Sequence, residues 1–234
     1  MKQPESLPLL ILFARAPEVG QVKTRLAPVL SAAACAQLQE AMTVDLLDAT
    51  GSLPVRRMLA CTPTTAHPFF LQCAQKHQIV LRKQEGASLG DRIAEAMGWG
   101  FGEGFQRVAL IGVDSPTLPL AFLREAFARL ETHRTVLGPT LDGGYYLIGA
   151  RDASPNIFTN IPWGTDRVFT ETLNRFNEQH LSCHLLPFWY DVDRPADLNL
   201  LVAHSTFLAR QGQPLPEQTL RMLRALSPHP PGDY

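Results

Sequence analysis

The stretch Ala109–Pro116, which reads Ala-Leu-Ile-Gly-Val-Asp-Ser-Pro, decides the fold of this chain. Its apolar run, which begins at Val108, is typical of a strand buried in a parallel sheet. The run ends at Gly112, and a carboxylate, Asp114, follows at the carboxyl end of the strand, where open α/β sheets bind ligands. Asp114 therefore has two interpretations: a cap of the next helix, or a ligand of a hard cation that carries phosphate oxygens.

Apolar and amphipathic runs alternate on both sides of this strand. Strands are expected at 9–14, 56–61, 79–81, 108–111, from 136 onward, at 145–148 and at 183–186. Helices are expected at 31–50, 68–77, 89–99, 120–130, 165–179, 196–209 and 217–226. This alternation predicts a single Rossmann-like α/β domain with a mainly parallel, mixed sheet and helices on both faces. We expect that domain over 1–212, followed by a C-terminal helix and a frayed tail over 213–234.

Composition excludes several classes of function. The 234 residues carry a formal net charge of −1, with 45% hydrophobic and 18% charged residues, which describes an ordinary globular protein. A near-neutral chain does not favour a nucleic-acid partner or an anionic membrane surface. The first apolar run ends at Arg15, too early for a signal peptide or a membrane span, so we expect a cytoplasmic protein. The four cysteines lack C-x-x-C spacing and are expected to be buried free thiols.

The loop after the first predicted strand carries three cations, Arg15, Lys23 and Arg25, around Gly20. The first strand-to-helix loop of such a sheet faces the ligand crevice. Glycine lets backbone N–H groups approach an anion, and Lys and Arg supply positive charge. The spacing matches neither the Walker loop nor G-x-G-x-x-G. We interpret the segment as a phosphate-binding loop, with a solvated basic loop as the alternative.

Two further segments carry candidate residues. Gln84 and Gly86 follow the third strand, where a Gln side chain can contact a base edge and Gly allows close approach. Alternatively, Ser88 simply caps the next helix. Farther along, Asp142-Gly-Gly predicts a hairpin turn, with one of the two following tyrosines in the core and the other pointing outward. The turn does not account well for Asp142, which is a candidate to hold an acceptor hydroxyl.

The last informative segment is Asp191-Val-Asp193-Arg-Pro195-Ala-Asp197. Pro195 suits the first turn of a helix, and Asp197 favours its dipole. Asp191 and Asp193 face opposite ways if the segment is extended. One of the two is a candidate to converge with Asp114 on a cation.

Five blocks, in order, resemble a known family. They are Phe13-Ala-Arg-Ala-Pro17 with Gly20-x-x-Lys23-Thr-Arg-Leu26, Gln84-x-Gly86-x-x-Leu89-Gly90-x-Arg92, Gly112-x-Asp114-Ser-Pro116, Gly138-Pro-x-x-Asp142-Gly-Gly-Tyr-Tyr-Leu147 and Asp191-Val-Asp193-x-Pro-x-Asp197-Leu198. The chain resembles the bacterial glycosyltransferase-like (DUF2064-like) family that includes proteins named for arsenosugar biosynthesis. That family is similar to GT-A fold nucleotidyltransferases, such as those of molybdenum-cofactor and phospholactate metabolism.

The resemblance implies a GT-A fold and roles for the phosphate and base contacts. By position, Arg15, Lys23 and Arg25 would hold the nucleotide phosphates, with Gly20 in the same loop. Gln84 and Gly86 would lie beside the base.

The resemblance also implies a metal site and a set of catalytic residues. Asp114 would bind Mg²⁺ or Mn²⁺, with Asp193 as the second ligand. Many glycosyltransferases of this fold carry Asp-x-Asp at the metal, whereas Val113-Asp114-Ser115 holds one Asp. Lys23, Arg25, Asp114 and Asp142 are then the expected catalytic residues, Asp142 as a base or orienting group on the acceptor side.

The expected function is a metal-dependent transfer from a nucleotide-activated donor to a small-molecule acceptor. The preferred hypothesis is sugar transfer from a sugar nucleotide. The alternative is a nucleotidyltransferase that releases pyrophosphate from a nucleoside triphosphate. The fold hosts both reactions. In either case the cation and the basic loop would neutralise charge on the departing group. An inactive nucleotide-binding module is the third hypothesis, and a homodimer is compatible with all three.

Overall fold

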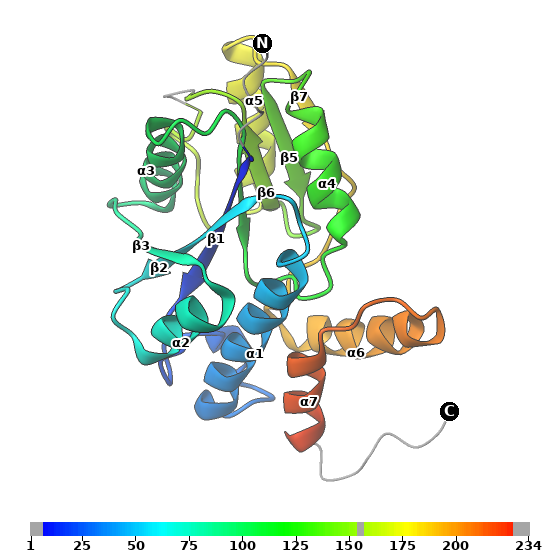
Figure 1. The fold of residues 1–234 in the computed structure, drawn as a ribbon. Helices are drawn as coiled ribbons and strands as arrows, with labels where there is room; N and C mark the ends of the chain where they lie inside the picture. The colour runs from blue at the N-terminus through cyan, green and yellow to red at the C-terminus, as the bar shows by residue number, and fades with distance from the viewer. Residues whose placement is uncertain (1–6, 154–156, 227–234) are drawn as a thin grey trace.

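Seven apolar runs form the strands of one mixed sheet in a computed structural model that describes residues 7–153 and 157–226 (Figure 1). The strands are β1 (Leu9–Arg15), β2 (Arg56–Thr62), β3 (Val80–Lys83), β4 (Val108–Gly112), β5 (Thr135–Pro139), β6 (Tyr145–Ala150) and β7 (Cys183–Leu185). Their order is β3-β2-β1-β4-β6-β5-β7. Strand β6 runs antiparallel to β4 and β5, while the other neighbours pair in parallel. The predicted mainly parallel, mixed sheet is therefore confirmed.

Each of the predicted helices is present, with small shifts at the ends. They are α1 (Ala32–Thr50), α2 (Pro68–His77), α3 (Leu89–Gly102), α4 (Leu120–Arg129), α5 (Val168–Glu178), α6 (Pro195–Arg210) and α7 (Glu217–Leu226), with a short 3-10 helix η1 (Thr24–Leu26). Local capping explains several starts. Ser88 and Asp91 form a reciprocal capping box at α3, and Pro195 occupies the first turn of α6.

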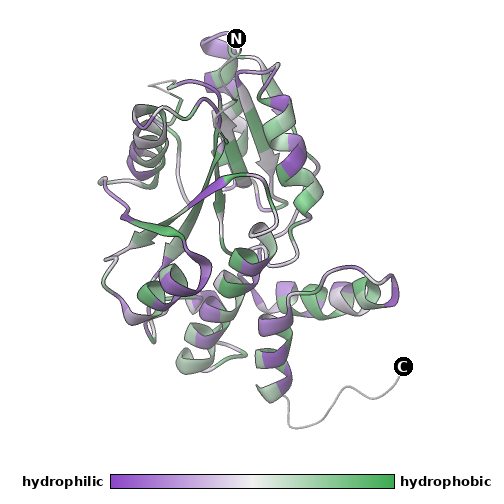
Figure 2. Ribbon diagram, viewed as in Figure 1, coloured by the Kyte–Doolittle hydropathy of each residue, from purple (hydrophilic) through white to green (hydrophobic). Residues whose placement is uncertain are grey.

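Successive side chains of a strand point to opposite faces of the sheet, and this alternation divides the core into two layers. Leu10 and Leu12 of β1 pack under α1, α2 and α4, whereas Leu9 and Ile11 pack under α3 and α5. Figure 2 shows the strands as hydrophobic along most of their length. Because both faces are covered, the sheet residues read as continuous apolar runs rather than as an alternating pattern.

The two tyrosines of β6 correct one expectation. Tyr145 and Tyr146 point to opposite faces, as predicted, but neither points outward, since helices cover both faces. Tyr146 is 3% exposed in the layer with α1, α2 and α4, and Tyr145 packs in the opposite layer.

The two C-terminal helices form a third cluster against α1, beside the main helical layers (Figure 1). The Asp45 carboxylate in α1 accepts hydrogen bonds from the backbone nitrogens of Gln218 and Thr219, at 2.9 and 2.8 Å, and so caps the start of α7. The expected boundary at 212 stays a prediction, and the expected frayed tail, 227–234, lies outside the described residues.

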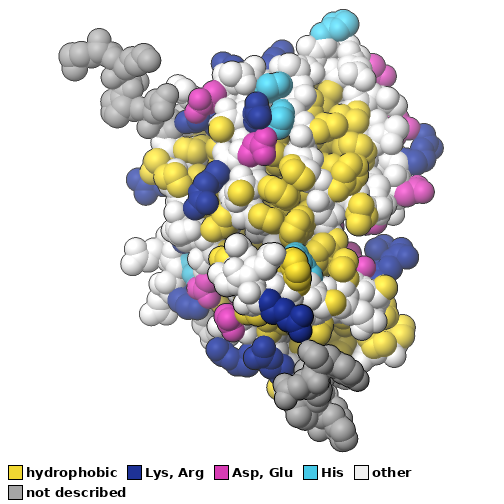
Figure 3. Space-filling view, turned by 90° about the vertical axis from the view of Figure 1, so that its right-hand side faces the viewer, with side chains coloured by type: hydrophobic (Ala, Val, Ile, Leu, Met, Phe, Trp, Pro, Cys, Tyr) yellow, Lys and Arg dark blue, Asp and Glu magenta, His cyan; other side chains and the backbone are white. Residues whose placement is uncertain are grey.

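The surface of the molecule bears on its partners. Figure 3 shows hydrophobic side chains gathered on one face, and the exposed apolar residues include Leu200, Val202 and Phe207 of α6. The expected homodimer stays a prediction.

Across 7–153 and 157–226, no helix has the length and apolar character needed to cross a membrane. The four cysteines are free, as predicted, but only Cys35, Cys61 and Cys73 are buried, while Cys183 is half-buried.

The topology places the candidate site. From β1 the chain adds β2 and β3 on one side and then crosses to β4 on the other, so the strand order reverses between β1 and β4. Open α/β sheets bind ligands at this switch point, beyond the carboxyl ends of the strands. The loops after Arg15 and after Gly112 meet there.

Candidate active site

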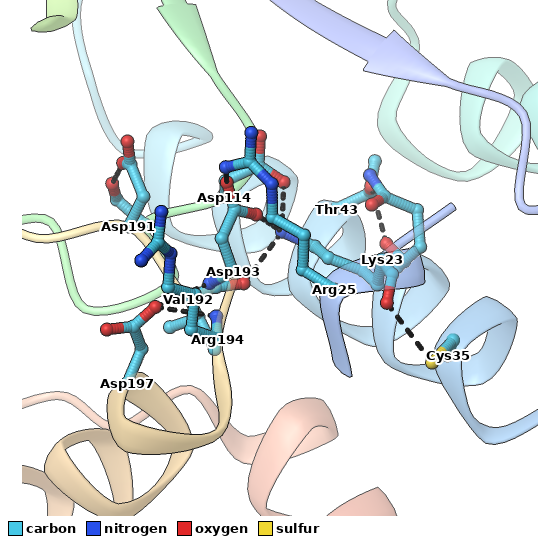
Figure 4. Close-up of polar contacts among 12 residues, drawn as sticks. Lys23, Arg25, Cys35, Thr43, Asp114, Asp191, Val192, Asp193, Arg194 and Asp197 are labelled. Atoms are coloured by element: carbon cyan, nitrogen blue, oxygen red, sulfur yellow. Dashed lines mark hydrogen bonds and ion pairs between the residues drawn. The ribbon is translucent and has the colours of Figure 1, made fainter. Parts of the chain in front are cut away.

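Lys23 lies among oxygen atoms that come from two distant parts of the chain (Figure 4). Its ammonium Nζ donates to Asp114 Oδ1 at 2.5 Å, to the Val192 carbonyl at 2.8 Å and to Asp193 Oδ1 at 2.9 Å. Burial alone would lower the pKa of Lys23, but the carboxylates of Asp114 and Asp193 outweigh burial and raise it above the usual value. The side chain, 3% exposed, therefore stays a cation at neutral pH.

The backbone at Lys23 takes an uncommon conformation. Its φ of 49° and ψ of 34° lie in the left-handed region, which few residues other than glycine adopt. The turn begins η1, and the Cys35 thiol donates to the Lys23 carbonyl at 3.4 Å. Gly20, three residues earlier, also has a positive φ of 80°. Such local strain is typical of sites where the fold holds a side chain in one position.

The segment 191–193 lies alongside the end of β4. The Val192 amide donates to the Asp114 carbonyl at 2.8 Å, and Ser115 Oγ donates to Asp191 Oδ1 at 2.5 Å. Both acidic residues of the segment reach the site: Asp193 binds Lys23, and Asp191 contacts Ser115. Both carboxylates therefore lie at the site, and nearness alone does not decide which of them would bind a cation with Asp114.

The carboxylates of the site repel one another. Burial raises the pKa of Asp191 to about 7, and the nearby carboxylates of Asp114, Asp193 and Asp142 add to the rise. Asp193 is neutralised by Lys23 and faces Arg25 at 3.9 Å.

A cavity of about 400 Å³ opens beside Asp114. Its walls come from β1, the start of α3, β4, the hairpin between β5 and β6, the segment 163–168 and the segment 191–194. Its polar lining residues include Arg25, Asp114, Thr140, Asp142, Asp191 and Arg194. Its aromatic lining includes Phe13, Tyr145 and Trp163. A volume of this size suits a small metabolite or part of a nucleotide.

The predicted hairpin is present, and it accounts for Asp142 better than the sequence suggested. Asp142 Oδ1 accepts hydrogen bonds from Thr140 Oγ1 at 2.6 Å and from the Gly144 amide at 3.1 Å. The carboxylate therefore stabilises its own turn. Asp142 also lines the cavity, so its expected role toward an acceptor stays a hypothesis.

Gln84 is fixed by the main chain of the sheet. It is 8% exposed, and its Nε2 donates to the carbonyls of Ala14 at 3.3 Å and Ala60 at 2.8 Å. The amide nitrogen is thus already used by β1 and β2, and the expected place of Gln84 beside a base stays a prediction. Gly86 has a φ of 137°, and an added Cβ would lie 2.8 Å from the Arg92 nitrogen. Both residues shape the loop before α3.

The predicted site residues separate into three groups. Arg25, Asp114 and Asp142 line the cavity, and Lys23 and Asp193 are joined to its lining through the contact of Lys23 with Asp114. The remaining candidates do not line the cavity: Arg15 ends β1, and Gly20, Gln84 and Gly86 lie in loops.

The residues near Lys23 have the donor chemistry for a hard divalent cation. Asp114, Asp191 and Asp193 offer carboxylate oxygens, which Mg²⁺ and Mn²⁺ prefer. Lys23 occupies Oδ1 of Asp114 and Oδ1 of Asp193, which leaves the second oxygen of each. Across the described ranges, no three His, Cys, Asp or Glu side chains are grouped to hold a metal ion by themselves. Mg²⁺ commonly needs only one or two carboxylates, with substrate phosphates and water completing its shell.

Sequence reasoning did not select Arg194, Trp163 or Thr140, which line the cavity. Trp163 lies in an irregular segment without periodicity. Arg194 belongs to the last of the five sequence blocks. Its position directly before Pro195, which starts a helix, could have indicated that it lies at the site.

Comparisons with known proteins agree with this architecture. A family profile described as "Uncharacterized protein conserved in bacteria (DUF2064)" matches residues 43–165. A 3-phospho-D-glycerate guanylyltransferase from Phenylobacterium zucineum (strain HLK1) is 32% identical over 183 residues, which cover 75% of this chain and 81% of the relative.

Solved structures extend the comparison to the whole fold. The crystal structure of a candidate nucleotide-diphospho-sugar transferase from Desulfovibrio desulfuricans G20 gives a TM-score of 0.85 at 31% identity, over 94% of this chain and 95% of that one. The inositol-1-phosphate CTP transferase from T. maritima gives a TM-score of 0.55 at 13% identity, over 96% and 99% of the two chains, a likeness in fold alone.

Proposed function

The chain belongs to the DUF2064 family, and from that premise we propose that it is a nucleotidyltransferase acting on a small phosphorylated acid. It transfers a nucleoside monophosphate from a nucleoside triphosphate and releases pyrophosphate. The observation that carries the proposal is the buried Lys23 ammonium, held by Asp114 and Asp193 at the switch point beside a small cavity. The guanylyltransferase relative supports this reaction and makes GTP and 3-phospho-D-glycerate the first substrates to test.

An acceptor phosphate suits this cavity because it needs no base. A phosphate dianion is already a nucleophile, whereas a sugar acceptor must lose a hydroxyl proton to a positioned group. Asp142, the expected base, has one oxygen engaged by Thr140 and Gly144. Sugar transfer remains the second candidate, because the structural neighbour from Desulfovibrio desulfuricans G20 is described as a nucleotide-diphospho-sugar transferase.

In the proposed reaction, the basic residues of the site bind the phosphates and neutralise the charge on the leaving group. An oxygen of the acceptor phosphate attacks the α-phosphorus of the triphosphate and forms the new P–O bond. The bond from the α-phosphorus to the α,β-bridging oxygen breaks, and pyrophosphate leaves with that electron pair. Lys23 and Arg25 neutralise the charge that develops on the leaving group, and Arg15 binds the outer phosphates.

A metal ion fits this arrangement. Asp114 and Asp193 would hold Mg²⁺ or Mn²⁺, with Asp191 next to them, and the ion would neutralise phosphate oxygens. The Lys23 ammonium shares these carboxylates, which places its positive charge next to the position that the ion would take. Gly20 lets the loop approach the phosphates, and Gln84 and Gly86 fix the main chain that contacts the base.

The experiment supplies the purified chain with GTP, ATP, CTP or UTP, each with 3-phospho-D-glycerate and Mg²⁺ or Mn²⁺. Pyrophosphate is followed by a coupled assay, and the nucleotidylated acid by mass spectrometry. Parallel reactions contain UDP-glucose or GDP-mannose with the same acceptor. We expect pyrophosphate only when a triphosphate and the acid are both present. Release of a nucleoside diphosphate from a sugar nucleotide would establish sugar transfer instead, and a lack of both turnover and nucleotide binding would overturn both candidates.

A further inference from the structure

Arg194 is a cavity residue that the proposed reaction leaves without a role. It directly precedes α6, and its backbone is fixed there (Figure 4). Asp197 Oδ2 accepts hydrogen bonds from the backbone nitrogens of Arg194 at 2.7 Å and Asp193 at 3.0 Å, and Pro195 sets the first turn of the helix. Across 7–153 and 157–226, no carboxylate forms an ion pair with its guanidinium. The backbone is held while the cation is left with open donors.

Four acidic residues line the cavity together with Arg194: Asp114, Asp142, Asp166 and Asp191. Three of them use Oδ1 for another partner, Asp114 for Lys23, Asp142 for Thr140 and Asp191 for Ser115. Among the described residues, none of the four forms an ion pair with Arg194. The Arg194 guanidinium therefore remains a place for an external anion. Its planar fork of donors matches a carboxylate in two parallel hydrogen bonds.

The wall on the hairpin side is built by close backbone contacts. Gly143 has a φ of 88°, and a Cβ there would lie 2.1 Å from the Asp166 carbonyl oxygen. A Cβ at Gly90 would lie 2.6 Å from the Trp163 indole nitrogen. Trp163 in turn meets the Tyr145 ring edge-on, with centroids 6.1 Å apart. The wall on this side is thus closely packed and partly aromatic.

We propose that Arg194 binds the carboxylate of the acceptor and sets the specificity for phosphorylated acids over phosphorylated alcohols. The inference rests on the proposed function, because it assigns one end of the same acceptor. With its carboxylate at Arg194 in the segment 191–194, a short acid directs its phosphate toward Asp114 at the edge of the cavity. A phosphorylated alcohol offers the same nucleophile but leaves the guanidinium without a partner.

The test compares 3-phospho-D-glycerate with glycerol 3-phosphate, which carries a hydroxymethyl group in place of the carboxylate. Both are assayed with GTP and Mg²⁺ on the wild-type chain and on Arg194→Met, Arg194→Lys and Arg167→Met. Arg167 is the matched control, because it lies at the start of α5 beside the cavity wall and pairs with Glu171. Calorimetric binding of each acid without nucleotide is measured in parallel.

We expect the wild type to prefer the acid and Arg194→Met to raise the KM for it by about 10- to 100-fold. The KM for glycerol 3-phosphate and for GTP should stay near the wild-type values, Arg194→Lys should recover part of the preference, and Arg167→Met should keep it. An equal loss for both acceptors, or a wild type without preference in turnover and binding, would overturn the inference.

The binding arm separates this inference from the proposed function. If no nucleotide is transferred but the wild type binds the acid and Arg194→Met does not, the acceptor assignment stands and the reaction does not. If pyrophosphate is released with the acid and Arg194→Met behaves as the wild type, the reaction stands and the assignment to Arg194 does not.

Discussion

The Lys23 ammonium and the Asp114 carboxylate lie 2.5 Å apart, although 91 positions separate them in the chain. The pair joins the first loop of the sheet to the end of β4, and Asp193 completes it from the C-terminal part. Lys23 is thus both the counter-ion of the site and its proposed phosphate ligand. Its removal should affect stability and metal binding separately.

Lys23→Met should lower the free energy of unfolding by about 1–3 kcal/mol, because two carboxylates lose their shared cation. The Asp114 and Asp193 side chains are 41% and 39% exposed, which keeps the loss below that of a fully buried pair. Urea denaturation measures the change. Lys76→Met, at an exposed pair with Asp48, is the control and should change stability little.

The same variant should bind Mn²⁺ more tightly than the wild type in the absence of nucleotide, because the carboxylates of Asp114 and Asp193 no longer bind an ammonium. Electron paramagnetic resonance of free Mn²⁺ gives the affinity directly. Equal or weaker Mn²⁺ binding in Lys23→Met would show that Lys23 and the metal do not share these carboxylates.

Asp114→Asn should abolish the metal-dependent part of the thermal shift produced by a nucleoside triphosphate, because the amide is a weaker ligand for a hard cation. Melting temperatures with and without Mn²⁺ measure the effect. Asp48→Asn, on the exposed face of α1, should retain the whole shift. A full metal response in Asp114→Asn would remove Asp114 from the metal site.

Gly143→Ala should destabilise the fold by more than about 2 kcal/mol, because the left-handed backbone and the close Asp166 carbonyl leave no space for a Cβ. Gly98→Ala is a matched control inside α3, where an added Cβ meets nothing within 4 Å. That substitution should stabilise by about 0.5–1 kcal/mol. Thermal or urea unfolding distinguishes the two, and equal effects would contradict the packing described for the hairpin.

Cys61 and Cys73 should resist alkylation in the folded protein. Burial raises the pKa of their thiols to about 12 and about 11, respectively, so both stay protonated at pH 8. Reaction with iodoacetamide followed by peptide mass spectrometry gives the rate at each site. Unfolding in urea should bring both rates to that of free cysteine, and fast alkylation without urea would contradict their burial.

The strands were predictable because burial on both faces leaves a continuous apolar run, as in Val108–Ile111. The hairpin at Asp142 was predictable from its turn residues. The outcome for Tyr145 and Tyr146 was not, since a local pattern does not reveal that helices cover both faces of the sheet. The role of the Asp142 carboxylate in its own turn depends on the neighbouring Thr140 hydroxyl, which the turn signal does not include.

The candidate site was predictable only as a set of loops at one edge of the sheet. That the segment of Asp191 and Asp193 lies beside Asp114 depends on hydrogen bonds between segments more than 70 residues apart. Trp163 lies in a segment without periodicity, so tertiary packing alone places it in the cavity. Sequence spacing carries no information on such contacts.

Phosphorus NMR of one reaction tests the central claim most directly. The wild-type chain is mixed with GTP, 3-phospho-D-glycerate and Mg²⁺, and the spectrum is followed with time. The account predicts that the GTP signals fall as pyrophosphate and a new diphosphate diester appear in equal amounts, and that neither appears with Asp114→Asn. GDP as the product, or pyrophosphate formed equally without the acid, would contradict it.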